Sequence, residues 1–400
     1  MEERETRGWS ESDERICSSC VEDYALKAAV AAEEEDDQGN CSFCESTRSA
    51  SFDALLDPFV DGIRFAYEDA VNVLSYVSSE GGFVGGSSID TWDLLHWELS
   101  DVFDNSDISD HIYACLDDKT WVRSGEPRRE IHVVLIDAWA RFCHAIKHET
   151  RYVFWLTSAS ADDLAEEENY GEVGPTRVLY HIGKIIDELG LLSTLEEGTE
   201  LFRARTYSKP PASPWNAGDL GTPPLDRSKQ GNRMSPAGIP MFYGAESLDV
   251  TMAEVSVRTE DRKASAGRFL TSRPSRVVDL TKLPRIPSIF DAELRHNRSE
   301  LEFLHRFTKE ISAPIEPGRD QIDYVPTQVM TEYLLRVHWG HKGVSGIRYP
   351  SAASSGEGCV VMDVSNENCL DPGDELTPDQ LQLVLESQQL FKGTLAWSHA

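Results

Sequence analysis

The sequence has few of the features that mark membrane proteins or nucleic-acid-binding proteins. Its longest apolar runs, VVLI at 133–136 and YVFWL at 152–156, are far shorter than the roughly 20 residues that a membrane span requires. Basic residues are scarce, because 38 Lys and Arg stand against 69 Asp and Glu, for a net charge of −31 at pH 7. A chain this acidic repels a phosphate backbone, so we do not expect nucleic acid as its main ligand.

The first residues of the sequence also predict no secretory signal. The segment MEERETRGWSESDER carries charges with no apolar stretch after them, so we expect no signal peptide and place the protein in the cytoplasm. With 400 residues, 40% of them hydrophobic, the chain is long enough for two or three folded domains.

Cysteine is unevenly distributed, and its distribution predicts a metal site. Of the eight cysteines, four lie near the N-terminus, as Cys17-Ser-Ser-Cys20 and Cys41-Ser-Phe-Cys44. In a reducing compartment, two CxxC pairs at this separation are typical of a four-thiolate zinc site. Because the protein supplies all the ligands, we expect a closed structural site that stabilises a small unit at residues 1–50. The alternative is four unrelated reduced cysteines.

Residues 51–195 are predicted to form a helical domain. Asp57-Pro58 is expected to start a helix whose apolar stripe runs from Phe59 to Val77 and which ends at Gly81-Gly82. The apolar spacing predicts further helices at about 90–103, 131–148 and 176–189.

After Gly198 the pattern changes to short β-type runs, turns and occasional helices, which is typical of an α+β domain. We place this domain at residues 196–372 and a C-terminal tail at 373–400. Strands are predicted at TELFRAR (199–205) and in the runs RVVDL, GIRYP and CVVMDV. The Pro- and Gly-rich segment 209–224 is expected to be a loop.

Several motifs of this domain carry polar residues suited to chemistry. They are LFRAR with Arg203, NRMSPAGIPMFYGA with Arg233 and Tyr243, TMAEV with Glu254, YVPTQ at 324–328, and GIRYPSA with Ser351. In order and context they resemble the RES family, named for its Arg, Glu and Ser, over residues 198–365. One motif departs from the family's commoner Arg-Trp-Asn-Pro-Pro-Gly form, because Arg233 is followed here by Met-Ser-Pro-Ala-Gly. The upstream CxxC pairs and helical region similarly resemble a HEPN/RES N-terminal domain.

The resemblance implies a fold like that of ADP-ribosyltransferases and an activity on NAD. Members of the family destroy NAD by phosphorolysis or hydrolysis, or transfer ADP-ribose to a protein, and several are toxins held inactive by an antitoxin-like partner. By this analogy phosphate is the preferred acceptor, water the second and a protein side chain the third. The resemblance assigns the family's paired arginines, its tyrosine, its glutamate and its serine to Arg203 and Arg233, Tyr243, Glu254 and Ser351.

These residue types also fit the chemistry of NAD. Planar guanidinium groups such as those of Arg203 and Arg233 bind pyrophosphate oxygens in pairs. Cleavage of the nicotinamide–ribose bond develops oxocarbenium character, which a carboxylate such as Glu254 stabilises. Tyr243 is suited to stack on nicotinamide or to hydrogen-bond through its hydroxyl. Ser351 is suited to position the pyrophosphate or the attacking phosphate rather than to act as a nucleophile, since no GxSxG motif surrounds it.

Each candidate residue also has a structural alternative: Arg203 as an arginine on a strand surface, Arg233 as an anchor for the long loop, Tyr243 as a core aromatic and Ser351 as an ordinary turn residue. Thr251-Met-Ala-Glu254 has the form of a helix capping box, which would explain Glu254 without catalysis. Arg141 and His148 fit the loose Arg–His pattern of HEPN ribonucleases, and His144 with His148 has the spacing of a metal pair, although a packed or solvated helix face is favoured. For the chain as a whole, the alternative to an NAD-cleaving enzyme is a non-catalytic binding module.

Overall fold

A computed structural model describes residues 8–36, 39–79, 81–125, 130–154, 173–209, 214–257, 263–316, 318–340, 342–353 and 357–392. The chain is a mixed α+β protein with one large mixed sheet, which confirms the predicted class. It divides into two compact units, which we call unit 1 (residues 1–131 and 285–302) and unit 2 (residues 132–284 and 303–400). Among the described residues, no helix has the length and apolar content needed to cross a membrane.

Unit 1 combines short helices with small sheets. A three-stranded sheet β1-β3-β2 lies near the N-terminus, and a second three-stranded sheet has the order β4-β8-β7. The elements are β1 (Arg15–Ile16), η1 (Ser18–Cys20), α2 (Tyr24–Ala32), β2 (Glu35–Asp36), β3 (Arg48–Ser51), α3 (Asp53–Ala66), β4 (Tyr67–Asp69), α4 (Ala70–Val73), β5 (Ser75–Val77), β6 (Gly82–Val84), β7 (Ser88–Asp90), α5 (Thr91–Asp93), η2 (Leu94–Glu98), η3 (Ser100–Val102), α6 (Ser106–Cys115), β8 (Thr120–Arg123) and η6 (Arg295–Asn297).

The N-terminal cysteine region shares its hydrophobic core with the helices that follow it. Cys17, Cys20 and Cys41 are buried in one apolar cluster with Leu26 of α2 and Phe59 of α3. The helix expected between the two CxxC pairs is α2, which Asp23 caps through hydrogen bonds from the backbone N–H groups of its first turn. The core of unit 1 is therefore continuous across residue 50.

The helix predicted to run from Asp57 to Gly81 is wrong at both ends. Helix α3 begins at Asp53, so Pro58 lies inside it, and it ends at Ala66. The next residues, Tyr67–Asp69, instead form β4, which pairs antiparallel with β8. The backbone hydrogen bonds of this sheet replace those of a continued helix, and the side chain of Asp69 then caps the short helix α4.

Unit 2 is built on a nine-stranded sheet of order β16-β17-β12-β10-β11-β15-β14-β13-β9. Its strands pair antiparallel except for the parallel pairs β13–β14 and β16–β17. The bounds are α7 (Ile131–His148), α9 (Val178–Glu188), β9 (Leu192–Leu195), β10 (Glu200–Thr206), α10 (Ala217–Leu220), η5 (Leu225–Arg227), β11 (Phe242–Ala245), α11 (Leu248–Val257), β12 (Lys263–Thr271), β13 (Ser275–Asp279), α12 (Arg298–Ser312), α13 (Asp320–Asp323), α14 (Val325–Glu332), η7 (Tyr333–His338), β14 (Val344–Pro350), β15 (Gly358–Met362), η8 (Asn366–Asn368), β16 (Cys369–Leu370) and β17 (Leu383–Lys392).

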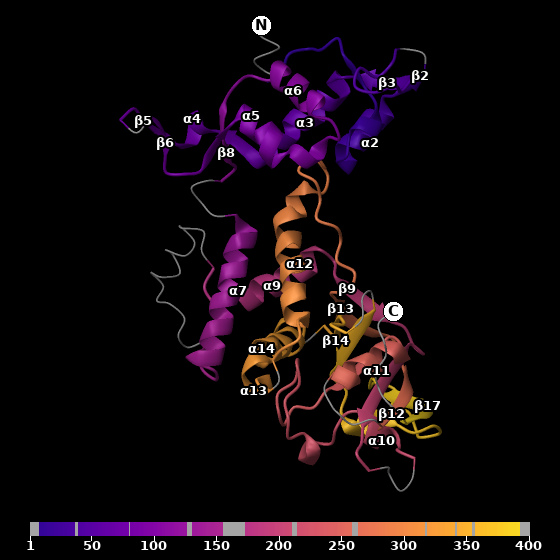
Figure 1. Cartoon of the computed structure of the whole chain (residues 1–400). Helices are drawn as coiled ribbons and strands as arrows, with labels where there is room; N and C mark the ends of the chain where they lie inside the picture. The colour runs from indigo at the N-terminus through magenta and orange to yellow at the C-terminus, as the bar shows by residue number, and fades with distance from the viewer. Residues whose placement is uncertain are drawn as a thin grey trace. The chain divides into compact units, whose positions relative to one another are not determined.

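Both faces of this sheet carry apolar side chains. Val278 of β13 and Val361 of β15 belong to one core cluster, whereas their neighbours Val277 and Val360 belong to another. This alternation is what the period of two along a strand requires when both faces are covered. The first cluster includes residues of α7, α9, α12 and α14, and α11 packs against β10 and β11 (Figure 1).

The predicted strands and helices of unit 2 correspond to observed elements. TELFRAR forms β10, the three apolar runs form β13, β14 and β15, and the predicted helices at 131–148 and 176–189 are α7 and α9. The segment 209–224 also contains the short helix α10, while its residues 210–213 lie outside the described residues. Part of the expected C-terminal tail forms β17, which pairs with the whole length of β12.

Candidate active site

A cavity of about 190 Å³ opens in unit 2 beside α11. Arg203, Tyr243 and Glu254 line it, which brings together three of the residues that the sequence singles out, from β10, β11 and α11. Its volume is below the roughly 300–1,000 Å³ of pockets that enclose a whole drug-sized ligand. The cavity therefore has room for a group smaller than a drug-sized ligand.

Strand pairing across the centre of the sheet builds one wall of the cavity. Phe202 of β10 is opposite Ala245 of β11, Ala245 is opposite Cys359 of β15, and Cys359 is opposite Tyr349 of β14. Residues opposite one another on adjacent strands share a face, so these four form a row. Tyr243 stands two residues before Ala245 and shares that face.

Arg203 is held rigidly at the edge of this cavity. Its Nε donates to the Leu220 carbonyl at 2.8 Å and its Nη1 to the Tyr243 carbonyl at 2.6 Å, and its guanidinium carbon lies 5.3 Å from the centre of the Phe242 ring. Burial, together with the charge of nearby Arg205, lowers the pKa of Arg203 to about 9. The group is therefore cationic at neutral pH. Within the described part of the chain, its Nη2 makes no hydrogen bond.

The hydroxyl of Tyr243 is committed to the loop that precedes its strand. It accepts a hydrogen bond from the Met234 N–H at 2.9 Å and donates one to Ser235 Oγ at 3.0 Å. These bonds fix the ring in the wall of the cavity. The ring surface, rather than the hydroxyl, is the part of Tyr243 that the arrangement presents to a ligand.

Glu254 and Ser351 form a direct pair. Ser351 Oγ donates to Glu254 Oε1 at 2.6 Å and accepts from the Ala353 N–H at 3.1 Å. Cys359 Sγ lies 3.8 Å from the same carboxylate oxygen. Ser351 therefore orients the carboxylate from the loop after β14, and its own proton is engaged in doing so.

The capping-box interpretation of Glu254 is wrong. Helix α11 starts at Leu248, and Ser247 Oγ accepts from the Val250 N–H at 3.3 Å, so the helix is capped one turn before Thr251. The Thr251 hydroxyl instead donates to the carbonyls of Ser247 and Phe202. Glu254 consequently has no role in starting the helix.

Arg233 does not line the cavity of Arg203 and Glu254. Its side chain is buried, its Nη1 donates to the carbonyls of Ile311 and Ala313 at 2.7 and 2.8 Å, and its guanidinium carbon lies 5.3 Å from the centre of the Tyr324 ring. It borders a separate hollow of about 470 Å³. Its sequence neighbour Asn232 lines the first cavity.

The motif YVPTQ supports the Arg233 loop. Tyr324 provides the ring beneath the guanidinium, Thr327 donates to the Arg233 carbonyl, and Gln328 Nε2 donates to the Asn232 carbonyl at 2.8 Å. All of these residues lie in or just before α14. The motif thus holds the loop against the sheet, and the position of Asn232 in the cavity depends on it.

Family models match the chain in two places, as a HEPN/RES N-terminal domain 1 over residues 34–160 and as a RES domain over residues 200–376. The chain contains a RES domain, preceded by a HEPN/RES N-terminal domain. The resemblance found in the motifs is therefore confirmed, together with the N-terminal extension. No curated protein and no solved structure matches the chain. The RES match contains every residue of the cavity and ends before β17.

The RES domain also places two residues in the cavity that sequence reasoning missed. They are Tyr349, whose pKa is raised well above its usual value by burial, and Cys359. Tyr349 stands two residues before Ser351 within GIRYPSA. Because residues two apart along a strand lie on the same face, the position of Ser351 could have predicted that of Tyr349. Cys359 comes from a wholly apolar strand and had no such signal.

The residues considered for a ribonuclease do not form a comparable site. Arg141 and His148 are both exposed on α7, and Arg141 Nη2 donates to the Val173 carbonyl at 3.0 Å. His144 Nε2 lies 3.3 Å from Glu149 Oε1, and both side chains are exposed. Among the described residues, the groups with metal-ligand geometry include neither His144 nor His148.

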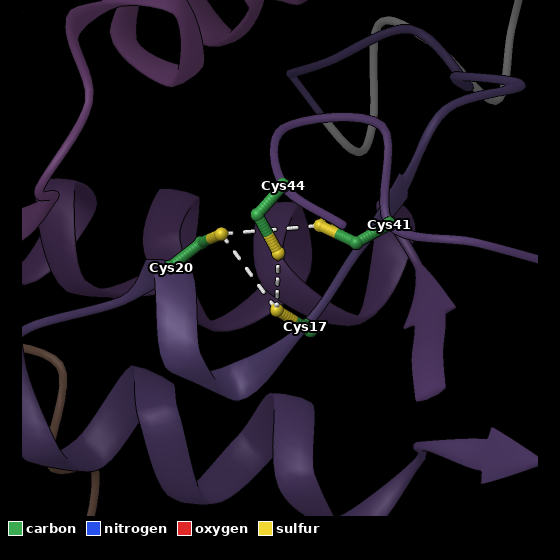
Figure 2. Close-up of side chains that lie close together, drawn as sticks. All are labelled: Cys17, Cys20, Cys41 and Cys44. Atoms are coloured by element: carbon green, nitrogen blue, oxygen red, sulfur yellow. Dashed lines mark hydrogen bonds between the residues drawn. The ribbon is translucent and has the colours of Figure 1, made fainter. Parts of the chain in front are cut away.

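The four N-terminal cysteines converge, as the sequence predicts. Figure 2 shows their side chains pointing toward one another, and the sulfur atoms of neighbouring pairs lie 3.4, 3.6 and 3.9 Å apart. A tetrahedral zinc ion with Zn–S bonds of about 2.3 Å requires sulfur separations of about 3.8 Å. The four thiols therefore fit zinc, and as a site with four protein ligands it would contribute stability rather than catalysis.

Proposed function

We propose that this RES domain protein cleaves NAD at the bond between nicotinamide and ribose. The observation that carries the proposal is the shared cavity of Arg203, Tyr243 and Glu254, in which Ser351 holds the carboxylate at 2.6 Å. A fixed cation, an aromatic surface and an oriented carboxylate are the groups that this reaction requires at one end of the dinucleotide. The RES domain match supports NAD as the substrate.

Each residue has a role in the proposed reaction. Arg203, held by two backbone carbonyls, presents Nη2 to an oxygen of the pyrophosphate. The ring of Tyr243 packs on the nicotinamide. Glu254 stabilises the positive charge that develops on the ribose as the bond to nicotinamide breaks, and Ser351 keeps its carboxylate in position. Arg233 has a supporting role, because its hydrogen bonds join the Asn232 loop to the end of α12.

The proposal includes an ADP-ribosyltransferase-like arrangement of the sheet and an acceptor for the ribose. By analogy with the family, phosphate is the preferred acceptor, water the second and a protein side chain the third. A toxin or defence role, with an antitoxin-like partner that blocks the cavity, follows from the same analogy. Isolation of the native protein without any stoichiometric partner would argue against such an inhibitor.

The test is incubation of the purified protein with NAD and phosphate, followed by mass analysis of the products. We expect release of nicotinamide by the wild type and a loss of at least about a hundredfold in Glu254→Gln, because the amide keeps the shape of the side chain but removes its charge. Asp249→Asn is the matched control, since Asp249 is an exposed carboxylate on the same helix.

The outcomes separate the proposal from its rivals. Nicotinamide release that is unchanged in Glu254→Gln would remove Glu254 from the mechanism. Tight NAD binding without turnover, with phosphate and with protein acceptors, would instead favour a binding module.

A further inference from the structure

Tyr349 lines the cavity of Arg203 and Glu254 with a hydroxyl that has no partner in the fold. Its side chain is 5% exposed, and within the described part of the chain the hydroxyl makes no hydrogen bond. The same oxygen is not one of the described side-chain atoms that are sealed from solvent without a partner. The open space that it reaches is therefore the cavity.

A tyrosine hydroxyl that is buried normally finds a hydrogen-bond partner in the protein. We propose that the Tyr349 hydroxyl donates a hydrogen bond to the carboxamide oxygen of nicotinamide, and that this contact makes the cavity specific for nicotinamide as the leaving group. The proposal rests on the proposed function, because it names the part of NAD that the cavity recognises.

Strand pairing places Tyr349 on the same face of the sheet as the ring of Tyr243. Tyr349 of β14 is opposite Cys359 of β15, Cys359 is opposite Ala245 of β11, and Tyr243 stands two residues before Ala245. Adjacent strands are about 4.8 Å apart, so β11 and β14 are separated by about 10 Å. The side chain of Cys359 between them is small. A nicotinamide ring that packs on Tyr243 and covers Cys359 therefore brings its carboxamide to the Tyr349 side of this row.

The surroundings of Tyr349 keep its hydroxyl protonated. Burial raises the pKa of Tyr349 well above its usual value, and the charge of Glu254 acts in the same direction. At the nicotinamide end of NAD, the carboxamide oxygen is the strongest uncharged acceptor for such a donor. The ribose hydroxyls are better matched to Glu254, because a carboxylate accepts hydrogen bonds more strongly than a neutral hydroxyl does.

The contact also assists departure of the leaving group. As the bond between nicotinamide and ribose breaks, its electron pair passes to the pyridine ring, and the conjugated carboxamide oxygen gains electron density. A fixed donor that faces an oxygen where negative charge develops stabilises the transition state more than the ground state. Tyr349 therefore contributes to the rate of cleavage as well as to recognition.

The test removes each partner of the proposed hydrogen bond in turn. We measure kcat/KM for NAD and for the analogue in which pyridine without a carboxamide replaces nicotinamide. In Tyr349→Phe we expect kcat/KM for NAD to fall about tenfold and that for the analogue to stay unchanged, because the analogue has no oxygen to accept the bond.

Tyr207→Phe is the matched control. Tyr207 is another buried tyrosine of unit 2, and its ring packs on Trp215 rather than in the cavity. A loss of the same size for NAD and for the analogue in Tyr349→Phe would overturn the proposal. The hydroxyl would then contact a part that both molecules share, such as the ribose, or serve the fold.

Titration calorimetry with nicotinamide gives a readout that does not depend on turnover. We expect nicotinamide to bind the wild type and Tyr207→Phe, and to bind Tyr349→Phe about tenfold more weakly. Equal affinities in the three proteins, or no binding to the wild type, would overturn the carboxamide contact. Urea denaturation completes the test, since loss of an unpartnered hydroxyl should leave the unfolding midpoint of Tyr349→Phe unchanged.

The two proposals fail in different ways. Nicotinamide release that is equally fast in the wild type and in Tyr349→Phe would leave the NAD-cleaving function in place and overturn the carboxamide contact. Nicotinamide binding that depends on Tyr349, without nicotinamide release from NAD, would support the contact and contradict the proposed reaction.

Discussion

At the scale of single residues, the two arginines of the family pattern have different surroundings. Arg203 makes its hydrogen bonds through Nε and Nη1 and lines the cavity with Glu254. Arg233 is 6% exposed and its Nη1 lies between two carbonyls at the end of α12. A buried guanidinium that satisfies two backbone carbonyls contributes to stability before it contributes to binding.

We therefore expect Arg233→Gln to lower the free energy of unfolding by about 3 kcal/mol, because it leaves the Ile311 and Ala313 carbonyls without their charged donor. Urea denaturation of the purified variant measures this change. Arg319→Gln is the control, since exposed Arg319 forms only a surface ion pair with Asp323. An unchanged urea midpoint together with a raised KM for NAD would restore the binding role that the sequence predicts for Arg233.

The residues of the site differ in how readily the sequence alone predicts them. Arg203, Tyr243, Glu254 and Ser351 stand in motifs whose order indicates the family, and they can be found without a structure. Cys359 cannot, because it enters the cavity only through its pairing opposite Ala245 and Tyr349. Such cross-strand neighbours depend on register, which the spacing of residues along the chain does not contain.

At the scale of elements, the spacing of apolar residues predicts a helix well where the same residues do not pair with a distant strand. Helix α7 spans Ile131–His148, as its apolar spacing predicts. The apolar stripe beyond Ala66 has helical spacing too, but its first residues pair with β8, a strand more than fifty positions away in the sequence. Long-range pairing of this kind overrides local propensity, and it is the reason why α3 is shorter than predicted.

The cysteine cluster is the element with the clearest test. We expect the purified protein to contain one equivalent of zinc, measured by elemental mass spectrometry, and chelation to unfold unit 1, because Cys17, Cys20 and Cys41 are part of its apolar core. Cys20→Ser should lose zinc. Cys115→Ala is the control, because Cys115 is buried in the same core but lies outside the cluster. Equal zinc content in both variants would rule out the four-thiolate site.

At the scale of the whole molecule, the compact units do not coincide with the family matches. The RES match covers residues 200–376, yet residues 285–302 within it belong to unit 1. Phe290 stacks on Phe59 with the ring centres 5.1 Å apart, and Tyr24 Oη donates to Asp291 Oδ2 at 2.6 Å. The RES domain thus contributes a segment to the core of the N-terminal unit, which a division of the chain by sequence pattern does not reveal.

Gly62 tests whether this segment packs as closely as the structure indicates. In the interior of a helix, alanine is normally more stable than glycine by about 0.5–1 kcal/mol. A Cβ at Gly62 of α3 would lie 2.2 Å from Phe290 Cδ1 and 3.1 Å from the Ile289 carbonyl oxygen. We therefore expect the opposite sign for Gly62→Ala, a loss of about 1–3 kcal/mol in the stability of unit 1, measured by thermal unfolding.

The matched control for this prediction is Gly82→Ala, since a Cβ at Gly82 meets no atom within 4 Å. If Gly62→Ala stabilises the protein, as it would in an isolated helix, then residues 285–302 do not pack against α3 in solution. If it destabilises the protein while Gly82→Ala does not, the RES segment is part of the N-terminal core. A fragment of the RES domain made without residues 1–131 would then expose Phe290, which is 5% exposed in the whole chain.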